Sequence, residues 1–476
     1  MGNFMTENPA NAATVAKHET PISPDDITVI DPDMHRKSVR AAALGNIMEW
    51  FDFGVYSYLA TVIGNVFFAG TSPSLQLVAT FGTFAAAFLV RPIGGMVFGP
   101  LGDLIGRQKV LAITMIMMSV ATFCLGLIPS YNSIGAAAPL LLLLVRLVQG
   151  FSTGGEYGGA ATFIAEYSPD KQRGFAGSFL EVGTITGYLL GALLVTLLNY
   201  LLSTNSMLDW GWRLPFFVSA PLGIFGLYIR LKLEETPAFQ AHIEKQEKDE
   251  KERGSRGVMA LLGQNLGALA QCIGLVLLFN VSNYMLTAYM PSYLSDTLGL
   301  GDHASLLLVI VLMFIMLPMT ALCGRITDTL GRRPVIALGA AGLIVLSYPA
   351  FLLITSHQIG LVFLGLLILG ILHGCFSGTM PSTLPALFAT DIRYSALAIG
   401  FNISVSLFGG TTPLINAWLV EKTGNLMIPA FYMAIAGVVG LVTIWAVKES
   451  AKRPLQGSQP AVHTHAEARE MVKESR

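Results

Sequence analysis

Long apolar segments separated by short polar ones dominate the chain and predict its secondary structure. Several uninterrupted apolar runs exceed the roughly 18 residues that a helix needs to cross a bilayer. We count twelve apolar spans, and each predicts a membrane-spanning helix: 42–69, 77–101, 109–129, 136–165, 174–202, 213–231, 264–294, 304–323, 334–355, 359–388, 394–420 and 427–447. The pattern therefore predicts an all-α integral membrane protein.

Polar segments divide these spans into two sets of six. Residues 1–40 form an N-terminal lead that we expect to be disordered, followed by a first six-helix half over 41–231. A linker over 232–263 carries a dense run of mixed charge, which is typical of a solvated segment. The second six-helix half covers 264–447, and a short tail covers 448–476.

The distribution of lysine and arginine predicts the orientation of these spans. Basic residues gather in the loops after even-numbered spans, whereas the odd-numbered loops hold only Arg213 and Lys422 near their ends. Positively charged loops remain on the cytoplasmic side of a membrane. We therefore expect a multi-pass protein with both termini, the linker and the tail in the cytoplasm.

One short polar loop occurs in both halves at a constant offset. Its residues lie between two apolar runs each time, and Gly99, Asp103, Gly106 and Arg107 return as Gly324, Asp328, Gly331 and Arg332. Glycine allows helices to approach closely, aspartate favours a helix N-terminus, and arginine pairs with carboxylates. Two halves that share this loop indicate a duplicated transporter. The loop is expected to join helices in one conformation and release them in another, and a purely structural loop is the simpler alternative.

Composition excludes several classes of protein. The chain is 53% hydrophobic and 12% charged, about half the charge of a soluble domain. A net charge of −1 argues against a nucleic-acid partner. The four cysteines lie singly, without metal-ligand spacing, and no nucleotide loop or nucleophile–base set is present. We expect no enzyme activity, no metal and no cofactor.

Ionisable side chains within the apolar spans are the strongest candidates for function, because each costs about 2.5–3.5 kcal/mol or more in the bilayer. All of them lie in the first half: Glu49, Asp52, Arg91, Arg146, Glu156 and Glu181. The interiors of the second-half spans hold no Asp, Glu, Lys or Arg, and only His373 titrates near neutral pH. Proton carriers are therefore expected mainly in the first half.

Helical spacing places several of these groups on shared faces. Glu49 and Asp52 are three residues apart on the first span, and Arg146 and Glu156 share a face of the fourth. A buried carboxylate that loses its arginine during a conformational change takes up a proton. We therefore predict Asp52 with Arg146 as the central proton-coupling pair, with Glu49 as second choice and Glu156 as a further member. A fixed structural ion pair is the alternative.

Aromatic and amide side chains near these charges predict a substrate site. The rings include Trp50, Tyr56 and Tyr157 in the first half, and the seventh span adds Asn280 and Tyr284. Aromatic faces attract cations that carry methyl groups, although most rings in membrane proteins serve packing or face lipid. The proposed substrate-binding set is Trp50, Tyr56, Arg91, Tyr157, Asn280 and Tyr284. Arg91 or Arg146 could hold a carboxylate of the substrate.

Several of these segments resemble one family. The two polar loops resemble the G-x-x-x-D-x-x-G-[RK]-[RK] gating loops of the major facilitator superfamily. Segments 44–56, 146–150 and 154–157 resemble its metabolite:proton symporters, and the likeness covers about residues 25–455. It implies two six-helix halves in the bacterial cytoplasmic membrane, with the arginine of the fourth helix communicating with an acid of the first.

The resemblance also implies a function. It implies proton-driven uptake of zwitterionic compatible solutes, such as proline and glycine betaine, activated by raised external osmolality. A symporter of organic acids, of the dicarboxylate or shikimate type, is the alternative, and a sensor or a channel is a more distant one. The tail after Lys448 shows no sustained heptads. A coiled-coil dimer through the tail is therefore not expected, and the oligomeric state and the osmotic threshold are left open.

Overall fold

The computed structural model describes residue 23 and residues 27–105, 107–154, 156–232, 265–390 and 392–474. The expected linker, apart from its first residue, lies outside the described residues, as does most of the N-terminal lead. Gly106 of the first polar loop also lies outside them, and so do the side chains of Asp103 and Arg107 in the same loop.

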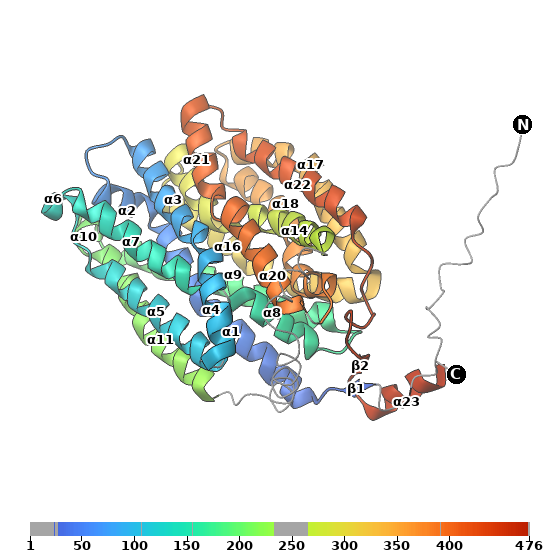
Figure 1. The fold of residues 1–476 in the computed structure, drawn as a ribbon. Coiled ribbons are helices and arrows are strands. Elements are labelled where there is room, and N and C mark those ends of the chain that lie inside the picture. Colours follow the sequence, from blue (N-terminus) through green and yellow to red (C-terminus); the bar gives the residue numbers. More distant parts are fainter. Residues whose placement is uncertain are drawn as a thin grey trace, which may run out of the picture.

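Helices build the first half, coloured blue to green in Figure 1. In chain order they are α1 (Pro32–Tyr58), α2 (Ala60–Phe67), α3 (Pro73–Leu89), α4 (Arg91–Ile105), α5 (Arg107–Leu127), α6 (Tyr131–Ile134), α7 (Ala137–Ser152), α8 (Glu156–Glu166), α9 (Arg173–Leu201), α10 (Thr204–Asp209), the short 3-10 turn η3 (Gly211–Arg213) and α11 (Leu214–Lys232).

Helices also build the second half, coloured yellow to red (Figure 1). They are α14 (Leu266–Tyr284), α15 (Met290–Ser292), α16 (Asp302–Leu330), α17 (Arg332–Ile354), α18 (Ile359–Ser377), α19 (Met380–Thr383), α20 (Arg393–Ser404), α21 (Thr412–Thr423) and α22 (Ile428–Ala446). Three π-helical turns, η4 (Met285–Tyr289), η5 (Tyr293–Thr297) and η7 (Val405–Gly409), and a 3-10 turn, η6 (Pro385–Leu387), continue these helices.

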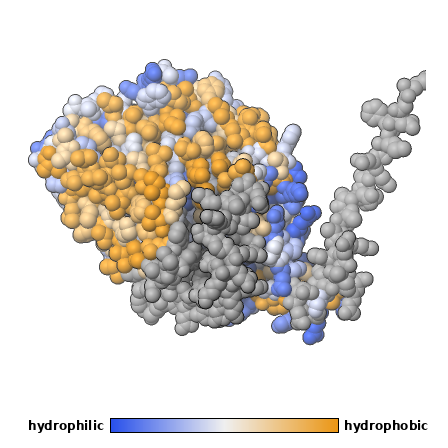
Figure 2. Space-filling view, viewed as in Figure 1, coloured by the Kyte–Doolittle hydropathy of each residue, from blue (hydrophilic) through white to orange (hydrophobic). Residues whose placement is uncertain are grey.

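These helices account for the twelve predicted spans. Within the described residues, nine helical segments are long and apolar enough to cross a membrane. The remaining three spans are α1, which carries Glu49 and Asp52, together with α5 and α11. The fold is that of an all-α membrane protein of two six-helix halves, and hydrophobic residues cover much of its visible side (Figure 2).

Two spans are interrupted at their middle, where local sequence disfavours a continuous helix. The second span breaks at Val90, two residues before Pro92, whose nitrogen carries no hydrogen to donate. The fourth breaks at Thr153 and Gly154, between α7 and α8. Arg91 begins α4 directly after the first break, and Glu156 begins α8 after the second.

Small residues allow these two spans to touch through their backbones. A Cβ on Gly150 would lie 1.7 Å from the carbonyl oxygen of Ala87, and one on Gly94 would lie 1.9 Å from that of Phe151. Such close contacts require glycine. They hold the helices that carry Arg91 and Arg146 against each other.

The two halves meet at both ends of the bundle. At the end where α9 begins, Asp328 of α16 accepts hydrogen bonds from the backbone N–H groups of Gly174 (2.7 Å) and Phe175 (2.8 Å). At the opposite end, Thr61 donates to Asp296 at 2.7 Å. We refer to the first of these as the terminal end, because the N-terminal strand and the C-terminal tail also lie there (Figure 1).

A two-stranded parallel sheet joins the two ends of the chain. Strand β1 (Thr28–Val29) pairs with β2 (Ala461–Val462), and helix α23 (His465–Glu474) follows β2. Hydrophilic residues gather in this region of the surface (Figure 2). The expectation of a disordered lead is wrong for residues 27–40, because β1 pairs and α1 already begins at Pro32 behind the Asp31 cap.

Candidate functional site

An ion pair links the first two spans in the interior of the first half. Arg91 Nη2 donates to Glu49 Oε1 at 2.9 Å, and both side chains are almost fully buried, at 1% and 4% exposure. A buried pair of this kind is stable only while both charges remain, since a lone charge is costly there. The structure therefore places Arg91 beside Glu49, the second-choice acid of the sequence prediction.

A chain of hydrogen bonds connects Arg146 to Asp52. Arg146 Nη1 donates to Gln149 Oε1 (3.0 Å), and Gln149 Nε2 donates to the Thr122 hydroxyl (2.7 Å). That hydroxyl in turn lies 2.7 Å from Asp52 Oδ2 and donates to it. The predicted pair is thus connected in this conformation through two neutral side chains, without a direct ion pair among the described contacts.

Arg146 itself has unused hydrogen-bonding capacity. Its side chain is buried, and in the part of the chain that the structure describes its Nε and Nη2 atoms have no hydrogen-bond partner. Its Cζ lies 4.1 Å from the centre of the Tyr56 ring, and the Tyr56 hydroxyl is held by Thr83 and by the Thr80 carbonyl. Tyr56 therefore supports the guanidinium from one face.

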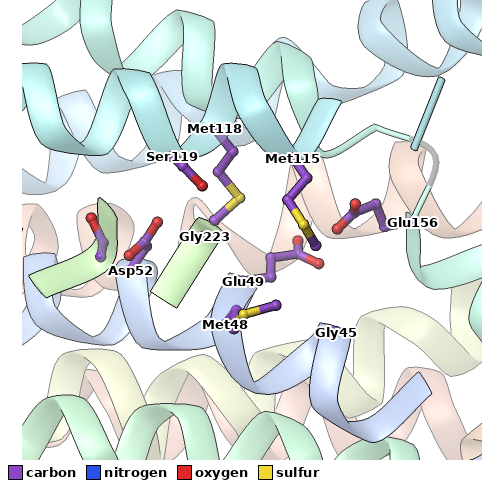
Figure 3. Close-up of a pocket in the computed structure, with 10 residues that line it drawn as sticks. Gly45, Met48, Glu49, Asp52, Met115, Met118, Ser119, Glu156 and Gly223 are labelled. Atoms are coloured by element: carbon purple, nitrogen blue, oxygen red, sulfur yellow. The ribbon is translucent and has the colours of Figure 1, made fainter. Parts of the chain in front are cut away.

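Three carboxylates reach one small cavity of about 20 Å³, enough for roughly one water molecule. Glu49 and Asp52 enter from α1 and Glu156 from α8, as Figure 3 shows. Other lining residues come from α5 and α11, including Met115, Met118, Ser119, Ser219 and Gly223. The structure therefore brings together the three acids that the sequence analysis selected for proton coupling.

Aromatic rings of both halves meet beside Arg91. We call Trp50, Phe53, Phe88 and Tyr284 the ring cluster. The Tyr284 ring of α14 lies 5.9 Å from that of Trp50 and 5.3 Å from that of Phe88, so the second half contributes directly to it. Trp50 and Tyr284, both predicted as substrate-binding residues, are in contact. Rings at these distances and tilts attract one another.

Four buried polar atoms of helices α14 and α18 have no hydrogen-bond partner among the described residues. They are Asn280 Nδ2, Asn283 Oδ1, the Tyr284 hydroxyl and His373 Nε2. His373 Nδ1 is 2.8 Å from the hydroxyl of Ser282. Buried polar groups are normally paired, so these two helices offer free donors and acceptors to a polar solute.

Tyr157 lies in a different group from the ring cluster. Its hydroxyl donates to Glu181 at 2.7 Å, and its ring stacks on Phe401 of the second half with centroids 3.8 Å apart. No contact between Tyr157 and either Trp50 or Tyr284 is present among the described residues to support its predicted role in binding substrate. Tyr157 connects a buried acid to the other half.

The second polar loop contacts both the first half and the tail. A Cβ added to Gly324 would lie 2.6 Å from the Cβ of Ser178. Asp328 caps α9, as described above. Gly331 has a φ of 104°, which favours glycine. Arg332 is buried, and its Nη1 donates to Ser450 at 2.6 Å. The gating role of both loops stays a prediction.

Thr122 and Phe88 are two site residues that the sequence patterns do not reveal. A single threonine inside an apolar span produces no spacing signal, because hydroxyls often bond their own helix. Phe88 lies before the break at Val90 and Arg91 after it, so helical spacing does not relate the two residues. Their importance depends on the neighbouring helix, which periodicity alone does not specify.

Comparison with known proteins gives the family. Residues 39–461 match the sugar (and other) transporter family. The chain belongs to this family. Members of this transporter family are membrane transporters and not enzymes, and the chain is accordingly a multi-pass membrane transporter.

Individual relatives within the transporter family cover nearly the whole chain. A proline/betaine transporter of Escherichia coli K12 is 52% identical and the match covers 96% of this chain and 92% of the relative. A glycine betaine/proline/ectoine/pipecolic acid transporter of Dickeya dadantii is 51% identical over the same shares. A putative proline/betaine transporter of Staphylococcus haemolyticus is 44% identical and covers 92% of this chain and 93% of the relative.

Solved structures show the fold of the transporter family. The proton:xylose symporter XylE of the major facilitator superfamily superposes with a TM-score of 0.73, covering 89% of this chain and 98% of that chain at 20% identity. The predicted major facilitator fold is thereby confirmed.

Proposed function

We propose that this transporter is a proton-coupled symporter of zwitterionic compatible solutes, with proline and glycine betaine as its substrates. The observation that carries the proposal is the buried guanidinium of Arg146. Two of its donors have no partner among the described residues, and its Cζ lies 5.1 Å from the centre of the Phe53 ring of the ring cluster. The names of the relatives support the choice of substrates.

A zwitterion makes two different demands, and the interior meets both. Its carboxylate needs charge-assisted donors, which Arg146 Nε and Nη2 supply. Its ammonium group, methylated in betaine, needs aromatic faces in place of hydrogen-bond acceptors. The ring cluster supplies those faces, and Asn280 adds a free amide donor at its edge.

Proton coupling follows from the hydrogen-bond chain between Arg146 and Asp52. A carboxylate that binds Arg146 draws the guanidinium away from Gln149 and so loosens the bonds from Gln149 to Thr122 and from Thr122 to Asp52. Asp52 then loses its donor in a buried setting and takes up a proton. Glu49 and Glu156, which line the same cavity, provide the remaining carboxylates of the route.

The proposal also includes the membrane in which the protein resides and its orientation there. Basic residues of the terminal end, among them Lys171, Arg325 and Arg333, support a cytoplasmic position for that end, with the protein in a bacterial inner membrane. We also propose that raised external osmolality activates transport. The proposed bounds of the two six-helix halves are 41–231 and 264–447.

Uptake of labelled solute into proteoliposomes that contain the purified full chain tests the proposal. An inward proton gradient and an external osmotic upshift are imposed independently, with proline, glycine betaine and a dicarboxylate as substrates. Accumulation of proline and betaine above their equilibrium level, dependent on the proton gradient, is the expected result. The osmotic upshift is expected to increase the rate further.

Two outcomes contradict parts of the proposal. Accumulation of the dicarboxylate but not of proline or betaine would establish the organic-acid symporter instead. Uptake that never exceeds equilibrium under a proton gradient would exclude symport and favour a channel.

A further inference from the structure

The ring cluster already contains a cation, which is the side chain of Arg91. The Arg91 Cζ atom lies 4.4 Å from the centre of the Phe88 ring, 4.9 Å from that of Phe53 and 5.6 Å from that of Trp50. Each distance is within the range of a cation–π contact. The guanidinium therefore occupies the faces that an incoming ammonium group would need.

Arg91 is held on one side only. Its Nη2 donates to Glu49, while its Nε has no hydrogen-bond partner among the described residues. The Tyr284 hydroxyl, at the far edge of the same cluster, is also without one in the described part of the chain. A buried guanidinium with a free donor gains energy when a second anion reaches it.

We propose that Arg91 is an internal substitute for the substrate's ammonium group. The ammonium displaces the guanidinium from the ring cluster, and the displaced guanidinium then joins Arg146 at the substrate's carboxylate. This inference rests on the proposed function and specifies how the site selects its substrate. The exchange therefore requires a positive group for the ring cluster and a negative group for the displaced guanidinium. A zwitterion supplies both groups, whereas a simple cation or a simple anion supplies only one.

Binding of glycine betaine and choline to the purified full chain tests this exchange, because choline carries the same trimethylammonium group without the carboxylate. The variant Glu49→Gln/Arg91→Gln removes both charges of the pair together. We expect it to bind choline at least about tenfold more tightly than the unmodified chain, because the rings are vacant. Betaine is expected to bind about tenfold more weakly, because its carboxylate loses Arg91.

Lys422→Gln is the matched control, since Lys422 Nζ lies 4.9 Å over the Trp418 ring outside the ring cluster. It should change neither affinity. Should the double variant fail to fold, Arg91→Lys retains the charge beside Glu49 with a shorter reach, and a smaller gain for choline is expected. Unchanged choline affinity in a folded variant overturns the inference, whereas an unmodified chain that binds neither betaine nor proline overturns the proposed function itself.

The C-terminal segment at the terminal end supports a second inference, which does not depend on the identity of the substrate. We call residues 449–474 the strap. Its first part lies mostly on the second half, where Glu449 accepts from the backbone N–H groups of Arg332 and Arg333, each at 3.0 Å. Within this part, the Arg453 carbonyl also accepts from Arg173 Nη1 of the first half at 3.1 Å. The Gln456 carbonyl accepts from Arg393 Nη2 at 2.8 Å.

The later part of the strap lies on the first half. Ala461 and Asp170 exchange two hydrogen bonds, from Asp170 N to the Ala461 carbonyl (3.0 Å) and from Ala461 N to Asp170 Oδ2 (3.1 Å). The β1–β2 pairing continues this contact. Between the two parts, the buried Leu455 packs with Ala165 of the first half and Ala386 of the second.

We infer that the strap holds the terminal end closed and must leave one half before that end opens. Opening separates the two halves there, and a segment bonded to both cannot follow both. The contacts with the first half are the ones that break, because Glu449 and Gln456 hold the beginning of the strap on the second half. Release of the strap therefore becomes a step in the transport cycle that sets its basal rate.

Val462→Asp tests the strap. Val462 is 4% exposed and packs with Ile27 and Ala468, so a carboxylate there opposes docking. Thr464→Asp is the matched control, because it adds the same charge at an exposed position and retains an oxygen for the Glu467 N–H. We expect Val462→Asp to increase hydrogen exchange in residues 165–173 and to raise uptake without osmotic upshift by about fivefold or more.

Thr464→Asp should leave both quantities unchanged. Faster exchange without any change in uptake would show that the strap is packing alone, and unchanged exchange would show that its docking does not depend on Val462. Either result overturns the inference.

Discussion

At the scale of single residues, Thr122 joins the acid of α1 to the arginine of α7 although it carries no charge. Its hydroxyl accepts from Gln149 and donates to Asp52, so each end of the chain of hydrogen bonds depends on it. Loss of one partner leaves a buried polar group unpaired, at a cost of about 1–3 kcal/mol. Thr122 is therefore the point at which the link between Arg146 and Asp52 is most easily broken.

Thr122→Val is expected to reduce proton-driven accumulation by about tenfold or more, because it keeps the shape of the side chain and removes the hydrogen bonds with Gln149 and Asp52. Thr122→Ser retains the hydroxyl and should retain most of the accumulation. The measurement is the steady-state ratio of internal to external solute in proteoliposomes under a fixed proton gradient. Equal accumulation by the two variants would contradict the proposed link.

Asp52→Asn provides a second test at this scale. An amide cannot carry a proton, so we expect accumulation to be lost while exchange of labelled for unlabelled solute across the membrane continues. Full proton-driven accumulation by this variant would show that Asp52 is not the proton carrier. Glu49, which faces the same cavity, would then be the next candidate.

At the scale of elements, the packing of α3 and α4 against α7 and α8 determines where both arginines lie. Gly150 and Gly94 permit backbone contact there because any Cβ would overlap a carbonyl oxygen. Gly82 of α3 provides a contrast, since a Cβ added to it would meet nothing within 4 Å.

Gly150→Ala is expected to destabilise the protein by about 1–3 kcal/mol or more, because the added methyl group forces the two spans apart. Gly82→Ala should be neutral or stabilising by up to about 1 kcal/mol, since alanine favours a helix. Thermal unfolding in detergent measures both effects. Equal midpoints for the two variants would contradict the close packing described for Gly150.

Much of this arrangement could be predicted from the sequence, and the remainder depends on contacts between elements. Apolar run length identified all twelve spans, and Pro92 and Gly154 stand at the breaks. Helical spacing placed Glu49 and Asp52 on one face, but it could not show that Arg91 pairs with Glu49, because partners on other helices depend on packing. The polar tail gave no apolar pattern from which the β1–β2 pairing could be predicted.

At the scale of the whole molecule, the strap and the Asp328 cap join the halves at the same end. The contacts of the strap include two imidazole rings, those of His35 and His463. His35 Nδ1 lies 2.8 Å from the Tyr167 carbonyl, and its ring is 5.8 Å from that of His463. Burial lowers the pKa of His35, and the nearby His463 and Arg36 lower it further, against the hydrogen bond to Tyr167.

Strap docking is therefore expected to depend on pH. The docked state favours neutral His35, so its contribution is complete above the ordinary pKa of about 6.5 and is lost as the pH falls through that value towards the lowered one. Iodide quenching of a fluorophore on a cysteine introduced at Thr464, with the four native cysteines replaced, measures docking. Quenching should increase below about pH 6.5, and His35→Gln should flatten that dependence, whereas His465→Gln should not.

The pairing of β1 with β2 also determines the order of events during synthesis. Residues 28–29 leave the ribosome before the first span does, and residues 461–462 leave it after the last span. The first strand therefore remains without its partner while all twelve spans enter the membrane. The terminal end can close only after the last span, α22, has entered the membrane. The strap therefore docks on a transporter whose two halves are already assembled.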